Sequence, residues 1–259
     1  MSNFRKTKSD IRNEYIHYSI TKSLLMFSRP IHYPIVVPKP SNERRLVIGD
    51  VHGCFYTLKK LVEDHLQLTK TDQLFLLGDY IDKGNHSAKV LDYLIHLIRE
   101  GYQVLPLRGN HEEKLLLAYE NGADVFEFYM ENYNCEDLLD GDVPQYLKFC
   151  NSLPYCIETE GFLLSHAGFS QTYRSPFSDT RSLFGRIDLQ VSDAQLDNNI
   201  FIKGHVATTL TMMQNLITQK AKSIRIDGGC VYKDIEEFGY LCALNLDTME
   251  LITQKNIEI

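Results

Sequence analysis

Cysteine is sparse and scattered in this chain. The six cysteines lie at positions 54, 135, 150, 156, 230 and 242, with no CxxC pair among them. A small secreted domain that depends on disulfides carries a denser framework, so we expect reduced and mostly buried thiols. No apolar run reaches the length of a membrane span, and the start "MSNFRKTKSD" is too polar for a signal peptide. These absences favour a soluble cytoplasmic protein with no membrane partner.

Positive charge is also limited. The 259 residues include 27 lysines and arginines against 34 aspartates and glutamates, which gives a formal net charge of -7 at pH 7. No long basic block stands out, so nucleic acid is not an expected partner. A negative balance still permits a phosphorylated substrate, because a bound metal ion can reverse the local field.

Repeats and low-complexity tracts are absent, but prolines are concentrated near the N-terminus. Four of the eight prolines lie in "RPIHYPIVVPKP", residues 29–40. This density excludes a helix or a central strand and predicts an extended segment that lies over the body of the protein. We therefore divide the chain into an N-terminal extension, residues 1–43, and a main domain, residues 44–259.

The main domain opens with an alternation of strand-like and helical patterns. Strand-like stretches are "RRLVIGDV", "DQLFLLGDYI" and "YQVLPLRGN", and helical spacing marks "FYTLKKLVEDHL" and "VLDYLIHLIREG". Residues 112–155 read as mainly helical, and the short apolar runs after them predict a second half that is mostly β. The rhythm indicates a layered α/β fold.

Five short fragments follow predicted strands and share one composition. They are "GDVHG" (49–53), "GDYIDKG" (78–84), "RGNHE" (108–112), "SHAG" (165–168) and "KGHV" (203–206). Each places Asp, Asn or His beside a glycine, which lets the backbone turn sharply and approach a ligand. Asp and His supply the oxygen and nitrogen atoms that bind metal ions. One such fragment is weak evidence, but five in order predict a metal site.

The series resembles the signature of the metal-dependent phosphoprotein phosphatases, the serine/threonine phosphatase family of the calcineurin-like metallophosphoesterases, in its bacterial or phage form. The resemblance begins near Arg44 and reaches the C-terminus. It implies that residues 44–259 form a metallophosphatase catalytic domain. It also implies a calcineurin-like four-layer α/β sandwich, in which helices flank two central mixed β-sheets.

The resemblance implies a centre of two divalent metal ions. By its pattern Asp50 and His52 bind one ion, and Asp79 bridges both. The second ion is completed by Asn110, His166 and His205. The set offers carboxylate, amide and imidazole ligands and no thiolate. We expect manganese, with iron or zinc as alternatives, in preference to calcium.

The family chemistry assigns further roles. A hydroxide shared by two metal ions attacks phosphorus directly, His111 protonates the leaving group, and Asp82 orients that imidazole. Substrate phosphate is expected to meet Asn110, Arg186 of "LFGR", and Lys83. At the Lys83 position the family carries arginine, so this chain keeps the charge but loses the bidentate fork.

Two positions are open to either a site role or a structural one. Arg108 either faces the site or forms a structural ion pair. Asp227, in "IDGGCVY", is interpreted as structural.

The main functional hypothesis is a protein serine/threonine phosphatase, with dual specificity left open, that acts on a phosphorylated protein or a small phosphoester. Broader metallophosphoesterases end their last motif in GHxH, whereas this chain has Ala207 in "GHVA". The alternative is a dinucleoside polyphosphate hydrolase, although Asp82 favours the phosphatase side. A catalytically degenerate phosphoprotein-binding module is a third hypothesis, which the complete ligand set disfavours.

Overall fold

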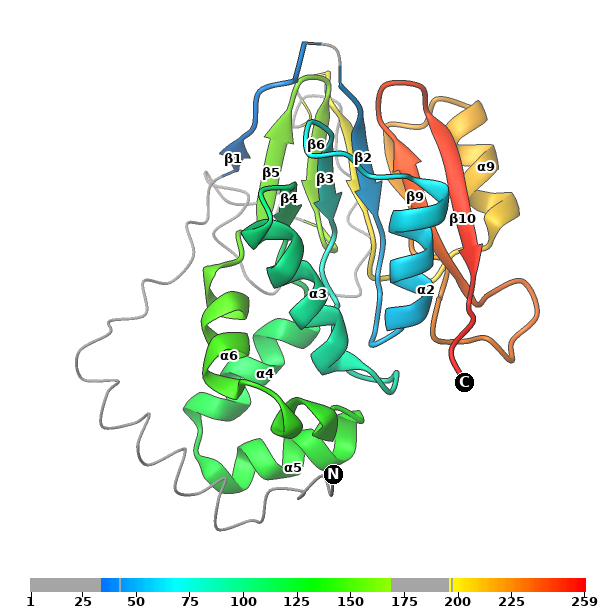
Figure 1. The fold of residues 1–259 in the computed structure, drawn as a ribbon. Coiled ribbons are helices and arrows are strands. Elements are labelled where there is room, and N and C mark those ends of the chain that lie inside the picture. The colour runs from blue at the N-terminus through cyan, green and yellow to red at the C-terminus, as the bar shows by residue number, and fades with distance from the viewer. Residues whose placement is uncertain (1–33, 42, 169–195, 197) are drawn as a thin grey trace.

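A computed structural model describes residues 34–41, 43–168, 196 and 198–259. Within this part of the chain lie two five-stranded sheets (Figure 1). The first sheet has the order β1 (Ile35–Val36), β5 (Cys156–Thr159), β6 (Phe162–Ser165), β7 (Ile200–Lys203) and β8 (Ser223–Arg225). The second has the order β10 (Glu250–Lys255), β9 (Tyr240–Asn245), β2 (Arg45–Ile48), β3 (Gln73–Leu76) and β4 (Gln103–Pro106).

Both sheets are mixed. In the second sheet β2, β3 and β4 run parallel, while β9 pairs antiparallel with both β2 and β10. In the first sheet only the β5–β6 pair is antiparallel. The expected α/β architecture with two mixed sheets and flanking helices is therefore confirmed.

Alternate residues of β2 face opposite layers, which shows how the sequence fills two cores. Leu46 and Ile48 belong to the cluster formed with the helices, whereas Val47 belongs to the cluster between the two sheets. Side chains of a strand alternate between its faces, so a strand buried on both faces must be apolar throughout. Leu164 and Ile202 of the first sheet complete the inter-sheet cluster.

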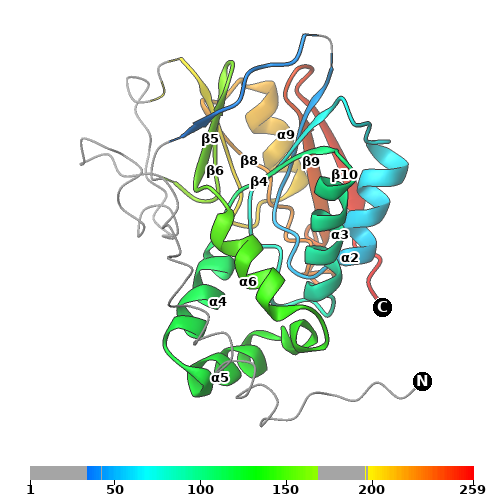
Figure 2. The ribbon, with the colours of Figure 1, turned by 60° about the vertical axis from the view of Figure 1, so that its left-hand side comes forward.

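The helical elements are α2 (Phe55–Lys60), the π-helical turn η1 (Leu61–His65), α3 (Ser87–Arg99), α4 (Asn110–Glu120), α5 (Ala123–Tyr133), the short 3₁₀ helix η2 (Glu136–Asp140), α6 (Val143–Ser152) and α9 (Leu210–Thr218). Helices α2 to α6 pack on the side of the second sheet that faces away from the first, whereas α9 packs beside β8 of the first sheet. In both ribbon views α4, α5 and α6 gather beyond one end of the sheets, and α2 and α3 run alongside (Figures 1 and 2). None of the described helices combines the length and apolar character needed to cross a bilayer.

Two local expectations need correction. The helical pattern from 55 to 66 is not one helix but α2 followed by the wider turn η1. The second half, expected to be mostly β, also contains α9. The Thr209 side chain accepts a hydrogen bond from the Met212 backbone N–H and so starts this helix. Met213 and Ile217, four residues apart, bury one face of it.

Two other expectations agree with the structure. Between Pro34 and Pro38 the chain is extended, and β1 pairs as an edge strand with β5. Proline lacks the N–H that a longer or more central strand needs. The six cysteines are free thiols, and all are buried.

A buried arginine joins the two sheets. Arg45 lies on β2, and its guanidinium donates to Asp247 Oδ1 at 3.0 and 2.8 Å and to the Glu160 carbonyl, in the β5–β6 turn of the other sheet, at 2.7 Å. The same guanidinium lies 5.2 Å from the centre of the Phe162 ring on β6. The Arg45 side chain is only 3% exposed. Its removal therefore breaks part-buried hydrogen bonds to Asp247 and to the Glu160 carbonyl.

We predict that Arg45→Leu lowers the free energy of unfolding by about 2–3 kcal/mol, because charged hydrogen bonds that span two sheets are lost. Arg44→Leu is the matched control. Arg44 also pairs with an aspartate, Asp72, but its side chain is 41% exposed, so the expected loss is below about 1 kcal/mol. Urea unfolding of both variants checks this difference, and equal losses would contradict an inter-sheet role for Arg45.

Candidate metal centre and active site

The five polar fragments follow the carboxyl ends of β2, β3, β4, β6 and β7, as the sequence predicted. Each sheet aligns its own parallel strands, so their carboxyl ends meet at one edge. Backbone hydrogen bonds then tie neighbouring fragments together. Val51 and His52 both donate their N–H to the Asp79 carbonyl at 3.0 and 2.8 Å, and Gly204 donates to the His166 carbonyl at 2.9 Å.

The backbone of the fragments is held in uncommon conformations. Positive φ angles occur at five predicted site residues: His52 (47°), Asp79 (54°), Asp82 (70°), Lys83 (65°) and His205 (69°). Non-glycine residues rarely adopt these angles, and they persist only where surrounding contacts fix them. Close packing adds a second restraint, since a Cβ atom at Gly204 would overlap Asp50 Oδ1. A side chain at this position would displace the Asp50 carboxylate.

Glu112 supplies much of this restraint. Its buried carboxylate accepts backbone N–H groups from Gly109 and Asp79 at 2.9 Å each and from Tyr80 at 2.7 Å. Glu112 thereby fastens the loop after β3 to the start of α4. Sequence reasoning assigned it no role, although it ends the fragment "RGNHE".

Two histidines have their proton positions set by the backbone. His52 Nδ1 donates to the Ile81 carbonyl at 3.0 Å, and His166 Nδ1 donates to the Leu77 carbonyl at 2.9 Å. With the proton on Nδ1, each Nε2 carries a lone pair that points into the site. A backbone acceptor that fixes the tautomer in this way is usual for metal-binding histidines.

Four ligand atoms converge around His166. Asn110 Oδ1 lies 2.9 Å from His166 Nε2 and 2.8 Å from His205 Nδ1. His166 Nε2 is 3.1 Å from His205 Nδ1 and 3.4 Å from Asp79 Oδ1. The His166, Asn110 and Asp79 atoms are all acceptors, so no hydrogen bond can join them. These atoms would hold a divalent cation, which would satisfy all three acceptors.

A second group of ligand atoms shares Asp79. The imidazoles of His52 and His111 approach Asp79 Oδ2 at 3.5 and 3.8 Å. His52, Asp79 and His111, like Asp79, His166 and His205, offer atoms that all lie within 4.8 Å of one another. Asp79 directs Oδ1 toward one group and Oδ2 toward the other, which is the arrangement that its predicted bridging role requires.

Asp50 lies beside these groups without belonging to either. Both of its oxygens accept the His205 backbone N–H at 3.1 Å. Burial, followed by the charges of Asp227 and Asp79, raises the pKa of Asp50 well above its usual range. A cation bound nearby favours the ionised carboxylate and removes this penalty.

The imidazoles are in the state that metal binding needs. Burial lowers the pKa of His52 to about 3 and that of His205 to about 4, so both rings are neutral at pH 7. Divalent cations bind neutral imidazole nitrogens and carboxylate oxygens, and this site offers both.

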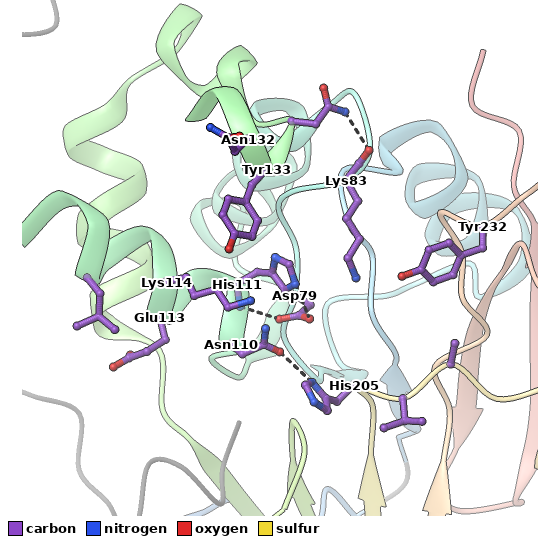
Figure 3. A pocket seen from close by; sticks show the side chains of 14 residues that line it. Asp79, Lys83, Asn110, His111, Glu113, Lys114, Asn132, Tyr133, His205 and Tyr232 are labelled. Atoms are coloured by element: carbon purple, nitrogen blue, oxygen red, sulfur yellow. Dashed lines mark hydrogen bonds and ion pairs between the residues drawn. The ribbon is translucent and has the colours of Figure 1, made fainter. Parts of the chain in front are cut away.

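The predicted acid and its partner are in direct contact. His111 Nδ1 lies 2.5 Å from Asp82 Oδ2, and Asp82 is fully buried. The His111 backbone N–H donates to Asp79 Oδ1 at 3.0 Å. These contacts hold both the ring and the backbone of His111, which lines the pocket with its Nε2 3.8 Å from Asp79 Oδ2 (Figure 3). This geometry suits an imidazole that gives a proton to a leaving group.

Lys83 reaches the same cluster. Its ammonium donates to His52 Nε2 at 2.7 Å and lies 5.6 Å from the centre of the Tyr232 ring. Figure 3 shows the side chain directed toward Asp79. The position agrees with a lysine that meets substrate phosphate, and a phosphate role for Lys83 and Asn110 stays a prediction.

The remaining arginines differ in what the structure says of them. Arg108 forms an ion pair with Glu113 at 2.8 Å and donates to the Asn151 carbonyl at 2.6 Å, which accounts for it as a structural residue. Arg186 lies outside the described residues. Asp227 accepts the Gly229 N–H at 2.8 Å within its own turn.

A pocket of about 970 Å³ opens over the ligand atoms. Tyr133 and Tyr232 stand on opposite sides of Lys83 in Figure 3 and both line the pocket. Lys114 lies 5.4 Å from the centre of the Tyr133 ring, so each tyrosine has an ammonium beside it. Sequence reasoning missed Tyr133 and Lys114, which lie outside any motif, whereas the end of "IDGGCVY" could have pointed to Tyr232.

Comparisons with known proteins agree on the family and divide on the substrate. The symmetrical bis(5'-nucleosyl)-tetraphosphatase of Buchnera aphidicola subsp. Schizaphis graminum is 33% identical over 125 residues, which cover 48% of this chain and 44% of that protein. A catalytic subunit of protein phosphatase 2A from Dictyostelium discoideum is 38% identical over 86 residues, covering 33% and 25%. The matched segments thus span less than half the length of these relatives.

Solved structures agree on the fold. A crystal structure provisionally described as a diadenosine tetraphosphatase superposes with a TM-score of 0.62 at 21% identity, covering 88% of this chain and all of that one. The sequence model of the calcineurin-like phosphoesterase family matches residues 44–234, which is well over half of the chain. Together with the two mixed sheets and the histidine–aspartate cluster at their edge, this match shows that the chain belongs to the calcineurin-like phosphoesterase family.

Proposed function

We propose that the protein hydrolyses dinucleoside polyphosphates at the centre built around Asp79. The observation that carries this proposal is the pair of tyrosines, each with a lysine beside it, in one pocket. A dinucleoside polyphosphate has two bases that stack on aromatic rings and a chain of negative phosphates that attracts ammonium groups. The likeness to symmetrical bis(5'-nucleosyl)-tetraphosphatases supports the same substrate class. The sequence motifs favour a protein phosphatase, whereas these features favour its alternative.

The general-acid pair, His111 and Asp82, favours a second candidate function, hydrolysis of a phosphoserine or phosphothreonine protein. A nucleotide leaves as an acidic phosphate and gains little from protonation, whereas a serine alkoxide needs a proton. The buried contact between His111 and Asp82 supplies such a proton donor. The likeness to serine/threonine phosphatases of Dictyostelium and Saccharomyces supports this candidate.

The residues of the site divide the work in either reaction. Two divalent cations, when bound, supply a nucleophilic hydroxide and neutralise charge on the phosphoryl oxygens. Asp79 holds the two ligand groups together, and His52 and His166 keep their lone pairs inward through their backbone contacts. Lys83 adds a fixed positive charge beside them. His111 holds the proton for the departing group.

A kinetic panel separates the two substrates. Manganese-loaded protein is assayed on diadenosine tetraphosphate, a phosphoserine peptide and p-nitrophenyl phosphate under the same conditions. We expect kcat/KM on the dinucleotide to exceed that on the peptide by about tenfold or more, which corresponds to about 1.4 kcal/mol of transition-state binding by the tyrosines and lysines.

Tyr232→Ala sharpens this panel. It should raise KM for the dinucleotide and leave p-nitrophenyl phosphate almost unchanged, because the latter has no base to stack. A higher kcat/KM on the phosphopeptide would overturn the proposal in favour of the second candidate. Hydrolysis of none of the three with Mn, Fe or Zn supplied would reject both.

The acid role predicts a dependence on the leaving group. We expect His111→Asn to reduce kcat on the phosphoserine peptide by about 100-fold or more and to reduce kcat on p-nitrophenyl phosphate far less, since only the alkoxide needs its proton. The matched control is His65→Asn, which removes an imidazole bonded to Gln254 away from the pocket. Equal losses on both substrates, with metal content intact, would remove His111 from this role.

A further inference from the structure

The acid pair has a third member that the sequence did not suggest. The hydroxyl of Tyr129, on α5, donates to Asp82 Oδ2 at 2.5 Å and lies 3.0 Å from the His111 carbonyl oxygen. Tyr129 is 4% exposed and does not line the pocket. It therefore contacts both residues of the acid pair without reaching the substrate.

Asp82 depends on these contacts because it is fully buried. Among the described residues no lysine or arginine pairs with its carboxylate, and Oδ1 accepts no hydrogen bond. The strong donors are the His111 imidazole and the Tyr129 hydroxyl, and both meet Oδ2. A buried carboxylate with so few hydrogen-bond donors is energetically unfavourable. Removal of one donor therefore leaves the position of the Asp82 carboxylate less restrained.

The helix that carries Tyr129 also holds the loop that carries Asp82. The Tyr129 ring stacks on Tyr133 with centroids 4.5 Å apart and an angle of 19° between the rings. The Tyr133 carbonyl accepts the Lys83 N–H at 2.9 Å. Asn134, which ends α5, donates to the Lys83 and Gly84 carbonyls at 2.9 and 3.2 Å. The loop after β3 thus lies against the end of α5 over several residues.

This support matters because the loop is strained. Asp82 and Lys83 follow one another with φ angles of 70° and 65°. Two successive non-glycine residues at such angles need outside contacts to persist. The backbone contacts from α5 hold the loop itself, whereas the Tyr129 hydroxyl contacts the Asp82 carboxylate.

We propose that Tyr129 is a positioning residue for the general acid. Its hydroxyl holds Asp82 Oδ2 in place, so that the carboxylate keeps the His111 ring turned with Nε2 toward the leaving group. The inference rests on the proposed acid role of His111, which matters most where the leaving group is a basic alkoxide or phenoxide that needs a proton. Tyr129 acts through His111 and has no contact with substrate of its own.

The test is Tyr129→Phe, which removes the hydroxyl and keeps the ring and its stacking. Phenyl phosphate and p-nitrophenyl phosphate serve as probes because they differ chiefly in the basicity of the leaving group. We expect kcat on phenyl phosphate to fall about tenfold, the loss of one hydrogen bond to a charged group, while p-nitrophenyl phosphate changes less than about twofold. KM and metal content should stay unchanged on both.

Tyr146→Phe is the matched control. Its hydroxyl also donates to a carboxylate, Asp92, at 2.8 Å, but in the packing of α6 on α3. It should lower the melting temperature and leave the ratio of the two rates unchanged. If Tyr129→Phe changes only the melting temperature in the same way, Tyr129 is structural and the proposal is overturned.

A double-mutant cycle decides whether Tyr129 acts through His111. In the His111→Asn background, Tyr129→Phe should have no further effect on phenyl phosphate. Additive losses would show an action independent of His111 and contradict the proposal. If His111→Asn alone spares phenyl phosphate, the acid role itself fails and the inference falls with it. If the kinetic panel shows that the protein prefers a phosphopeptide to a dinucleotide, this test is unaffected, because it uses only phenyl phosphate and p-nitrophenyl phosphate.

Discussion

The structure depends on one aspartate more than on any other residue. Asp79 receives the His111 N–H on one oxygen, and its carbonyl accepts the N–H groups of Val51 and His52. Its own N–H is bound by the Glu112 carboxylate. The polar groups of this residue are therefore committed to two other fragments, "GDVHG" and "RGNHE". Because the two carboxylate oxygens face separate sets of histidines, one side chain determines how both halves of the site lie.

This arrangement explains why strained backbone is tolerated here. The fragments around Asp79 contain five predicted site residues at positive φ, and packed glycines leave no room for relaxation. The two sheets offset this cost, because their apolar strands pack against one another and support the carboxyl ends from which the fragments emerge. A rigid support of this kind is what a centre with closely spaced ligands requires.

The sequence predicted those parts of the fold that arise from local pattern. Apolar strands that end in Asp, Asn or His beside glycine specify both the sheet and the positions of the ligands. Tyr129 and Tyr133 could not be found in this way, because their contact with the loop after β3 exists only once α5 packs against it. The motifs also do not distinguish the two candidate substrates. The motifs are common to hydrolases of both kinds, whereas Tyr133 and Lys114, which also line the pocket, lie between the motifs.

The central claim, a two-cation centre bridged by Asp79, is tested most directly by metal stoichiometry. Purified protein is loaded with Mn²⁺, exchanged into metal-free buffer, and measured by mass spectrometry beside Asp79→Asn and the control Asp92→Asn. The account predicts two ions per chain in the wild type and the control. It predicts loss of both ions in Asp79→Asn, because one bridging charge serves both. One ion in the wild type, or two ions retained by Asp79→Asn, would contradict it.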